Sequence, residues 1–135
     1  MLKKLQTCVR DGIFWLDSNI PGWHKKINLE IFELNICGRC IVGQICGLEN
    51  EEGIIQSLRY AHFLIQNHIN DKKLGFNSPF KYEEEFVNGK ESKYSKSWKV
   101  LTALWKREIV RLRRAERKNN INEMDSMYSR KLIHV

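Results

Sequence analysis

The feature that most restricts the fold of this chain is a long stretch of helical periodicity late in the sequence. Large apolar residues recur there three or four positions apart, which places them along one side of an α-helix; they are Trp98, Leu101, Trp105, Ile109 and Leu112. We expect a helix over about residues 95–119. The pair Asn119-Asn120 should end it. A short helix over about residues 121–133 should follow, with Asn120 as its cap and Glu123 completing a capping box.

Other stretches also predict helices, and one predicts a hairpin. Residues 2–17 carry apolar side chains at helical spacing, and Pro21-Gly22 stops that pattern because proline cannot continue a helix. The pair Asn88-Gly89 favours a tight turn between two short strands. At 135 residues and 42% hydrophobic composition, the chain has the size of one domain with its own core. The predicted fold class is therefore mainly α, or α+β with one short hairpin, in a single compact domain (1–135) of four to five helices.

Two further helices are expected in the middle of the chain. The first should follow a cap at Asn35 and end near Gly47, with one face made of Cys37, Cys40, Ile41, Gln44 and Ile45. The second should run from a cap at Asn50 to about Asn67. Its apolar stripe consists of Ile54, Leu58, Ala61 and Ile65, and we expect this stripe to face the core.

The N-terminal residues and the cysteine usage bear on the compartment. Met1 to Leu5 begin like a signal peptide, but Gln6, Thr7 and Arg10 interrupt the apolar run that a signal peptide needs. No stretch approaches the roughly 18 apolar residues of a membrane-spanning helix. We therefore expect a cytoplasmic protein without a membrane partner, whose four cysteines are reduced thiols or metal ligands.

The excess positive charge lies in one segment of the chain. The sequence holds 23 Lys or Arg and 16 Asp or Glu, a net charge of +7. Residues 96–118 contain nine basic and two acidic side chains, a local balance of 9 − 2 = +7. The remaining 14 basic and 14 acidic residues cancel. Any attraction for an anionic partner should therefore come from the predicted late helix.

The basic side chains of this segment fall on the side of the helix that faces away from the apolar seam. At about 100° per residue, Arg107, Arg111, Arg114 and Lys118 lie opposite the seam, along roughly 16 Å of helix. We call the full set the basic ridge: Lys106, Arg107, Arg111, Arg113, Arg114, Arg117 and Lys118. Planar guanidinium groups suit phosphate and carboxylate. The alternative is an ordinary solvated face, made basic because cations near a helix C-terminus complement the helix dipole.

The spacing Cys37-Gly38-Arg39-Cys40 allows three interpretations. Two thiolates at this spacing suit zinc, but a tetrahedral site needs two more ligands, for which Cys46 and His62 are candidates along with His24 and His68. A cytosolic Cys-x-x-Cys that opens a helix is also typical of thioredoxin-like redox sites. In the third interpretation, Cys37 and Cys40 are small core residues, because free cysteine is among the most buried residue types.

The sequence contains none of the common catalytic patterns. It has no Gly-rich phosphate loop, no His-Glu-x-x-His and no nucleophile elbow. The carboxylates Glu83, Glu84 and Glu85 fit a solvated loop better than a catalytic pair. No catalytic residue is predicted, and an enzyme is less favoured than a binding protein. A nucleotide or small-molecule sponge, with the basic residues inside a pocket, is a further alternative.

A scattered set of motifs is similar to small bacteriophage and prophage proteins. The motifs are Trp15-Leu16-Asp17, Pro21-Gly22-Trp23, Cys37-x-x-Cys40-Ile-Val-Gly43-Gln44-x-x-Gly47, Leu74-Gly75-Phe76 and Leu101-Thr102-x-x-Trp105-x-x-x-Ile109. This resemblance implies an accessory protein of a mobile element, acting in the host cytoplasm, and a candidate inhibitor of host defence. The leading hypothesis is a non-catalytic protein without a cofactor whose basic ridge binds nucleic acid or an acidic or nucleic-acid-binding host protein. The alternative is a zinc- or thiol-dependent protein centred on Cys37 and Cys40.

Overall fold

The fold is organised around one very long helix. The computed structural model describes the backbone of residues 1–133 and the side chains of residues 1–128. Its elements are α1 (Leu2–Asn19), the 3-10 turn η1 (Trp23–Lys26), α2 (Ile41–Ile45), η2 (Leu48–Asn50), α3 (Gly53–Gln66), β1 (Phe86–Val87), β2 (Lys90–Glu91) and α4 (Lys93–Ile133). The predicted mainly helical class, with one small hairpin, is confirmed.

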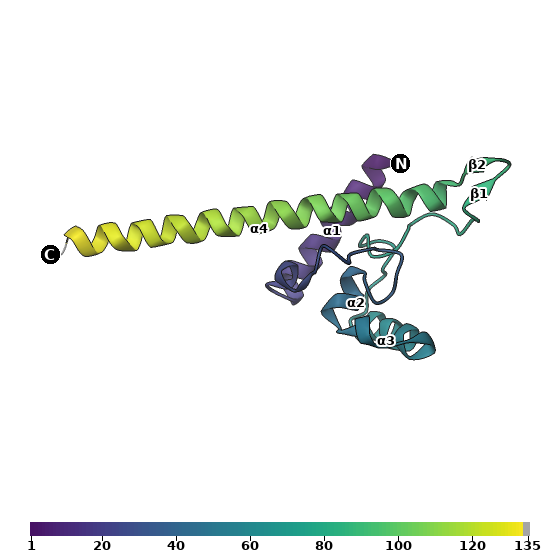
Figure 1. Cartoon of the computed structure of the whole chain (residues 1–135), viewed down its shortest axis with the longest axis horizontal. Coiled ribbons are helices and arrows are strands. Elements are labelled where there is room, and N and C mark those ends of the chain that lie inside the picture. Colours follow the sequence, from purple (N-terminus) through teal and green to yellow (C-terminus); the bar gives the residue numbers. More distant parts are fainter. Residues whose placement is uncertain (134–135) are drawn as a thin grey trace.

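Helix α4 spans most of the length of the molecule (Figure 1). Helix α1 crosses its first half, α2 and α3 lie below that crossing, and the hairpin lies near its N-terminal end. The seam predicted from the sequence faces inward: Leu101, Trp105 and Ile109 are fully buried, and Trp98 and Leu112 are half-buried. After the contacts of Arg113 and Glu116 with η1, the helix projects away from every other element.

The predicted division of this helix at Asn119-Asn120 is wrong. Helix α4 is continuous over 41 residues and contains no break between the expected helices at 95–119 and 121–133. Asparagine is a weaker helix former than alanine by only about 0.7 kcal/mol per residue. A helix that is already nucleated by the packed residues before Leu112 can therefore extend through both asparagines.

The core centres on the Trp105 side chain. Its ring stacks on Phe76, with ring centroids 5.8 Å apart, and meets Trp23 edge to face at the same separation. Its indole Nε1 donates a hydrogen bond of 2.7 Å to the Gly75 carbonyl. Gly12 of α1 lies against this ring, because a β-carbon there would be 2.9 Å from the indole and 2.1 Å from the Leu74 carbonyl oxygen. The glycine therefore sets how closely α1 approaches α4.

Helix α2 is shorter than predicted. The helix expected between Asn35 and Gly47 begins only at Ile41, and Cys40 rather than Asn35 is its cap, accepting the Gly43 N–H on its sulfur at 3.3 Å. Residues before Cys40 form turns that fold back onto the helix, and the Cys37 carbonyl lies where a β-carbon of Gly43 would be. Glycine at position 38 also disfavours a helical start by about 1 kcal/mol relative to alanine.

The buried amide of Gln44 holds the irregular segment between η1 and α2. Its side-chain oxygen accepts the Asn28 N–H at 2.6 Å. Its side-chain nitrogen donates to the carbonyls of Asn28 and Arg39, at 3.2 and 3.0 Å. Because every polar atom of this amide is paired, its burial carries little of the usual penalty for a polar group.

Helix α3 is turned by half a revolution from the predicted orientation. The stripe expected to face the core points to solvent, and no residue of this helix is fully buried. The opposite face carries Phe63, which packs against Trp15, and Gln56 and Tyr60, which form specific hydrogen bonds.

The short hairpin formed by β1 and β2 agrees with the prediction. Phe86 pairs with Glu91 and Val87 with Lys90, and both turn residues, Asn88 and Gly89, have positive φ.

Candidate anion-binding surface

The basic ridge lies where α4 leaves the rest of the molecule. Six of its seven side chains are exposed, as predicted. The exception is Arg113, which is half-buried and turns toward η1. Its guanidinium donates hydrogen bonds to the backbone carbonyls of His24, with Nε at 3.1 Å, and of Ile27. Two of its three nitrogens, Nε and Nη2, are therefore already used inside the protein, so Arg113 supports the fold whether or not it also contacts a partner.

A carboxylate of α4 partly neutralises two arginines of the ridge. Glu108 accepts the Arg111 Nε at 2.7 Å, and its other oxygen lies 3.8 Å from the Arg107 guanidinium. Both arginines are more than half exposed, so these contacts with Glu108 are worth little in water. The two guanidinium groups nevertheless share one negative charge.

The other four exposed members of the ridge have no such partner. Lys106, Arg114, Arg117 and Lys118 make no ion pair with any described side chain. Glu116 lies among them in sequence but binds elsewhere. It accepts the Lys25 ammonium and lies 3.3 Å from His24 Nε2. The hydrogen bond from Lys25 lowers the pKa of Glu116. Glu116 therefore neutralises the Lys25 ammonium of η1 rather than a cation of the ridge.

Helix α1 adds a cation that the sequence did not identify. Arg10 lines a cleft of about 300 Å³ between α1 and α4, together with Arg107, Glu108 and Arg111. Apolar residues form the rest of its wall, among them Val9, Ile13 and Leu104. The periodicity of residues 2–17 places Arg10 on an exposed face. Nothing in the sequence indicates that this face lies beside the ridge.

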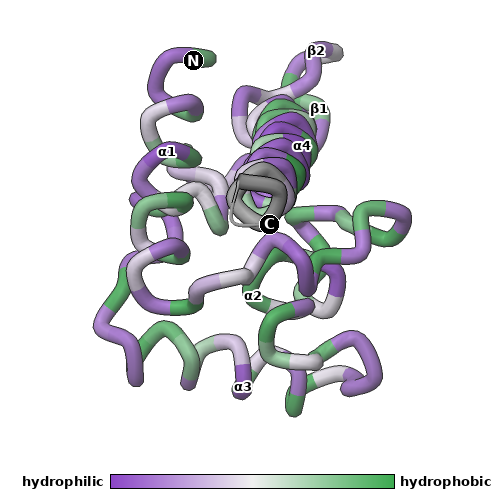
Figure 2. The backbone as a smooth tube through the Cα atoms, turned by 90° about the vertical axis from the view of Figure 1, so that its left-hand side faces the viewer, coloured by the Kyte–Doolittle hydropathy of each residue, from purple (hydrophilic) through white to green (hydrophobic). Residues whose placement is uncertain are grey.

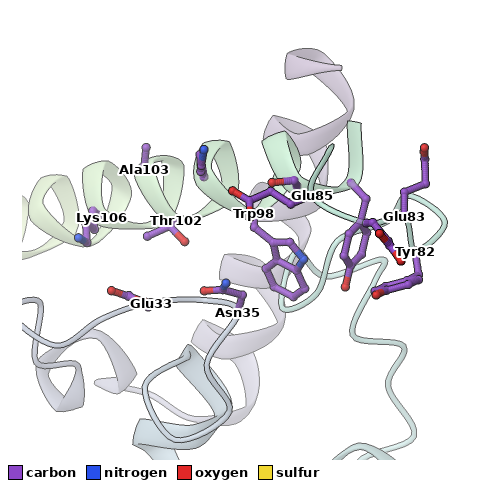
Figure 3. Close-up of a pocket in the computed structure, with 13 residues that line it drawn as sticks. Glu33, Asn35, Tyr82, Glu83, Glu85, Trp98, Thr102, Ala103 and Lys106 are labelled. Carbon is purple, nitrogen blue, oxygen red and sulfur yellow. The ribbon is translucent and has the colours of Figure 1, made fainter. Parts of the chain in front are cut away.

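An acidic and aromatic groove borders the ridge on the side of the hairpin. Glu33, Tyr82, Glu83, Glu85 and Trp98 point into it, with Lys106 at its edge (Figure 3). Glu83, Glu84 and Glu85 are exposed, in agreement with the predicted solvated loop. Because these carboxylates repel anions, the surface suited to an anionic partner ends at Lys106 and extends from there toward the projecting end of α4.

The cysteines that suggested a metal or redox site are held by structural contacts. The Cys40 thiol donates to the Cys37 carbonyl at 3.2 Å, and the Cys37 thiol contacts the Gln56 carbonyl at 3.7 Å. Burial raises the pKa of Cys40 to about 12 and also raises the pKa of Cys37, which disfavours the thiolates that zinc and redox chemistry need.

The candidate zinc ligands do not form one cluster. Cys40 is buried beneath α2, whereas Cys46 and His62 line a shallow depression on α3. Among the described residues, no three side chains of His, Cys, Asp or Glu converge as metal ligands would. The arrangement therefore fits the interpretation of Cys37 and Cys40 as packing and capping residues.

Comparison of the sequence with protein-family models, with curated proteins and with solved structures returns no match. Within residues 1–133, no helix combines the length and apolar composition that crossing a membrane requires. The surface of the protein is therefore what indicates its function.

Proposed function

We propose that the protein is a non-catalytic binding protein whose basic ridge engages nucleic acid. The observation that carries this proposal is the position of Arg114, Arg117 and Lys118. These three cations are exposed where α4 leaves the packed body, just after its contacts with η1, and have no carboxylate partner among the described residues. Each is therefore available to a phosphate without first breaking an internal contact.

The shape of this helical segment suits a polyanion. A single α-helix is about 10–12 Å wide with its side chains, and the major groove of DNA is about 12 Å wide. Figure 1 shows that no other element flanks the C-terminal third of α4. A nucleic-acid backbone can therefore approach it from several sides. Arg107, Arg111 and Arg10 extend the positive surface back onto the body.

The chemistry of the ridge indicates backbone contacts rather than base-specific recognition. Arginine and lysine dominate it, and these side chains neutralise phosphates whatever the sequence. The resemblance to small bacteriophage proteins suggests that the nucleic acid belongs to the host or to a host defence complex, which the bound protein would occlude.

The test is a charge-reversal experiment read against salt. The variant Arg114→Glu, Arg117→Glu, Lys118→Glu should lose at least about tenfold in affinity for a labelled duplex DNA or RNA, and its affinity should depend less on salt than that of the unmodified protein. The matched control is Lys72→Glu, Lys73→Glu, Lys81→Glu, which changes net charge equally at three exposed lysines elsewhere. Equal losses in both variants would show that only net charge matters and would remove the ridge from the proposal.

A further inference from the structure

Helix α3 exposes an apolar stripe to solvent. Its large residues are Ile54 (75% exposed), Ile55 (55%), Leu58 (61%) and Ile65 (73%), and the small residue Ala61 lies between them. On a helix with about 100° per residue, positions 54, 58, 61 and 65 fall within one narrow strip. The helix lies at the edge of the molecule opposite α4 (Figures 1 and 2). Large contiguous apolar surfaces of this kind mark interaction sites.

Specific contacts on the other side of α3 fix this orientation. The Gln56 amide donates to the carbonyls of Leu48 and Glu51, at 2.9 and 3.2 Å. The Tyr60 hydroxyl donates to the Asp71 carboxylate at 3.1 Å. Phe63 packs edge to face against Trp15 of α1, with centroids 6.0 Å apart. Turning the stripe inward would break all of these contacts, so the stripe remains available to a partner.

The spacing of the stripe is the same in both directions along the helix. From Ile54 the steps are four, three and four residues, to Leu58, Ala61 and Ile65. Two copies of α3 related by a twofold axis would lie antiparallel and place Ile54 opposite Ile65 and Leu58 opposite Ala61. Each layer at the centre then pairs a large side chain with a small one, as interdigitating helices require. A twofold interface needs such a self-complementary surface.

The surface beside the stripe also fits this arrangement. The shallow depression beside Leu58 and His62 lies next to this stripe and can receive an apolar side chain such as Ile55 of the second copy.

We propose that the occupant of this stripe is a second copy of the same chain, which forms a symmetric dimer through antiparallel pairing of α3. The proposal is independent of the nucleic-acid proposal, because α3 and the basic ridge share no residue.

The test is sedimentation of the full chain over a range of concentrations. The unmodified protein should pass from its 16.0 kDa monomer to twice that mass as concentration rises. Leu58→Glu buries a charge at the centre of the pair and should weaken the dimer by at least about tenfold. The matched control is Met124→Glu, at an equally exposed apolar residue of α4 (69%), which should leave the dimer intact. Equal helix content by circular dichroism checks that both variants fold.

Three results would overturn the proposal. The unmodified chain could remain a monomer at every concentration. Met124→Glu could dissociate the dimer as much as Leu58→Glu does, which would place the interface on α4. A dimer that survives Leu58→Glu would have its interface elsewhere.

Discussion

The Arg113 guanidinium donates hydrogen bonds to the backbone carbonyl of His24, 89 residues earlier in the chain. A second bond goes to the carbonyl of Ile27, the C-cap residue of η1, so both bonds hold the C-terminal part of η1. Arg113 therefore joins α4 to the N-terminal part of the fold, while its neighbour Arg114 faces solvent. Two adjacent arginines of the ridge thus have different roles.

This difference predicts different effects on stability. Arg113→Lys keeps the charge but loses the planar fork whose Nε and Nη2 reach the two carbonyls, so it should lower the free energy of unfolding by about 2 kcal/mol, the usual range for lost hydrogen bonds to a charged group. Arg114→Lys should change it by less than about 0.5 kcal/mol, as is usual at exposed sites. Urea denaturation followed by circular dichroism measures both. Equal stabilities would contradict the bridging role of Arg113.

A second prediction concerns the close approach of α1 to Trp105. Alanine normally stabilises a helix by about 1 kcal/mol relative to glycine. At Gly12 the added methyl group would lie 2.1 Å from the Leu74 carbonyl oxygen, so Gly12→Ala should instead lower the free energy of unfolding by about 1–3 kcal/mol, the usual cost of overpacking. Gln6→Ala, at an exposed position of the same helix, is the control and should have little effect. A stabilised Gly12→Ala variant would show that the two helices are farther apart.

A third prediction concerns the pH dependence of the Cys40 thiol. Burial raises its pKa from 9.0 to about 12, so the unfolded thiol ionises before the folded one. The free energy of unfolding should therefore fall as the pH rises from about 9 toward 12. Cys40→Ser keeps a capping oxygen but does not titrate there, and should lose this part of the pH dependence. Denaturation curves at several pH values provide the measurement.

The same property predicts slow chemical modification. At pH 8 an alkylating reagent should react with Cys40 much more slowly than with the half-buried Cys46, and full unfolding in urea should remove the difference. Mass spectrometry of the modified peptides distinguishes the two residues. Rapid alkylation of Cys40 in the folded protein would contradict its burial.

The sequence predicted those parts of the fold that depend on neighbouring residues. The seam on α4, helix α1 and the Asn88-Gly89 turn follow from periodicity or turn chemistry, and all three are present. The outward direction of most of the ridge follows from the same periodicity. These features can be predicted without knowing which helices and strands contact one another.

The parts that could not be predicted depend on contacts between distant residues. The role of Arg113 rests on carbonyls near residue 24, and the contribution of Arg10 rests on the crossing of α1 with α4. The orientation of α3 follows from side-chain partners such as Asp71 for Tyr60, which outweigh the apolar pattern of the helix itself. The continuity of α4 through Asn119-Asn120 reflects extension from a packed segment, which composition does not reveal.

The uninterrupted backbone of α4 also fixes the direction around the helix axis in which its cations point. Because Ile109 is locked in the core, each later residue points in a direction set by its count from that anchor. One alanine inserted after Arg113 would rotate Arg114, Arg117 and Lys118 around the helix axis by about 100° and move them by about 1.5 Å along it. Seven inserted alanines would nearly restore the original direction. Binding through this part of α4 thus depends on the angular position of the cations around the helix as well as on their charge.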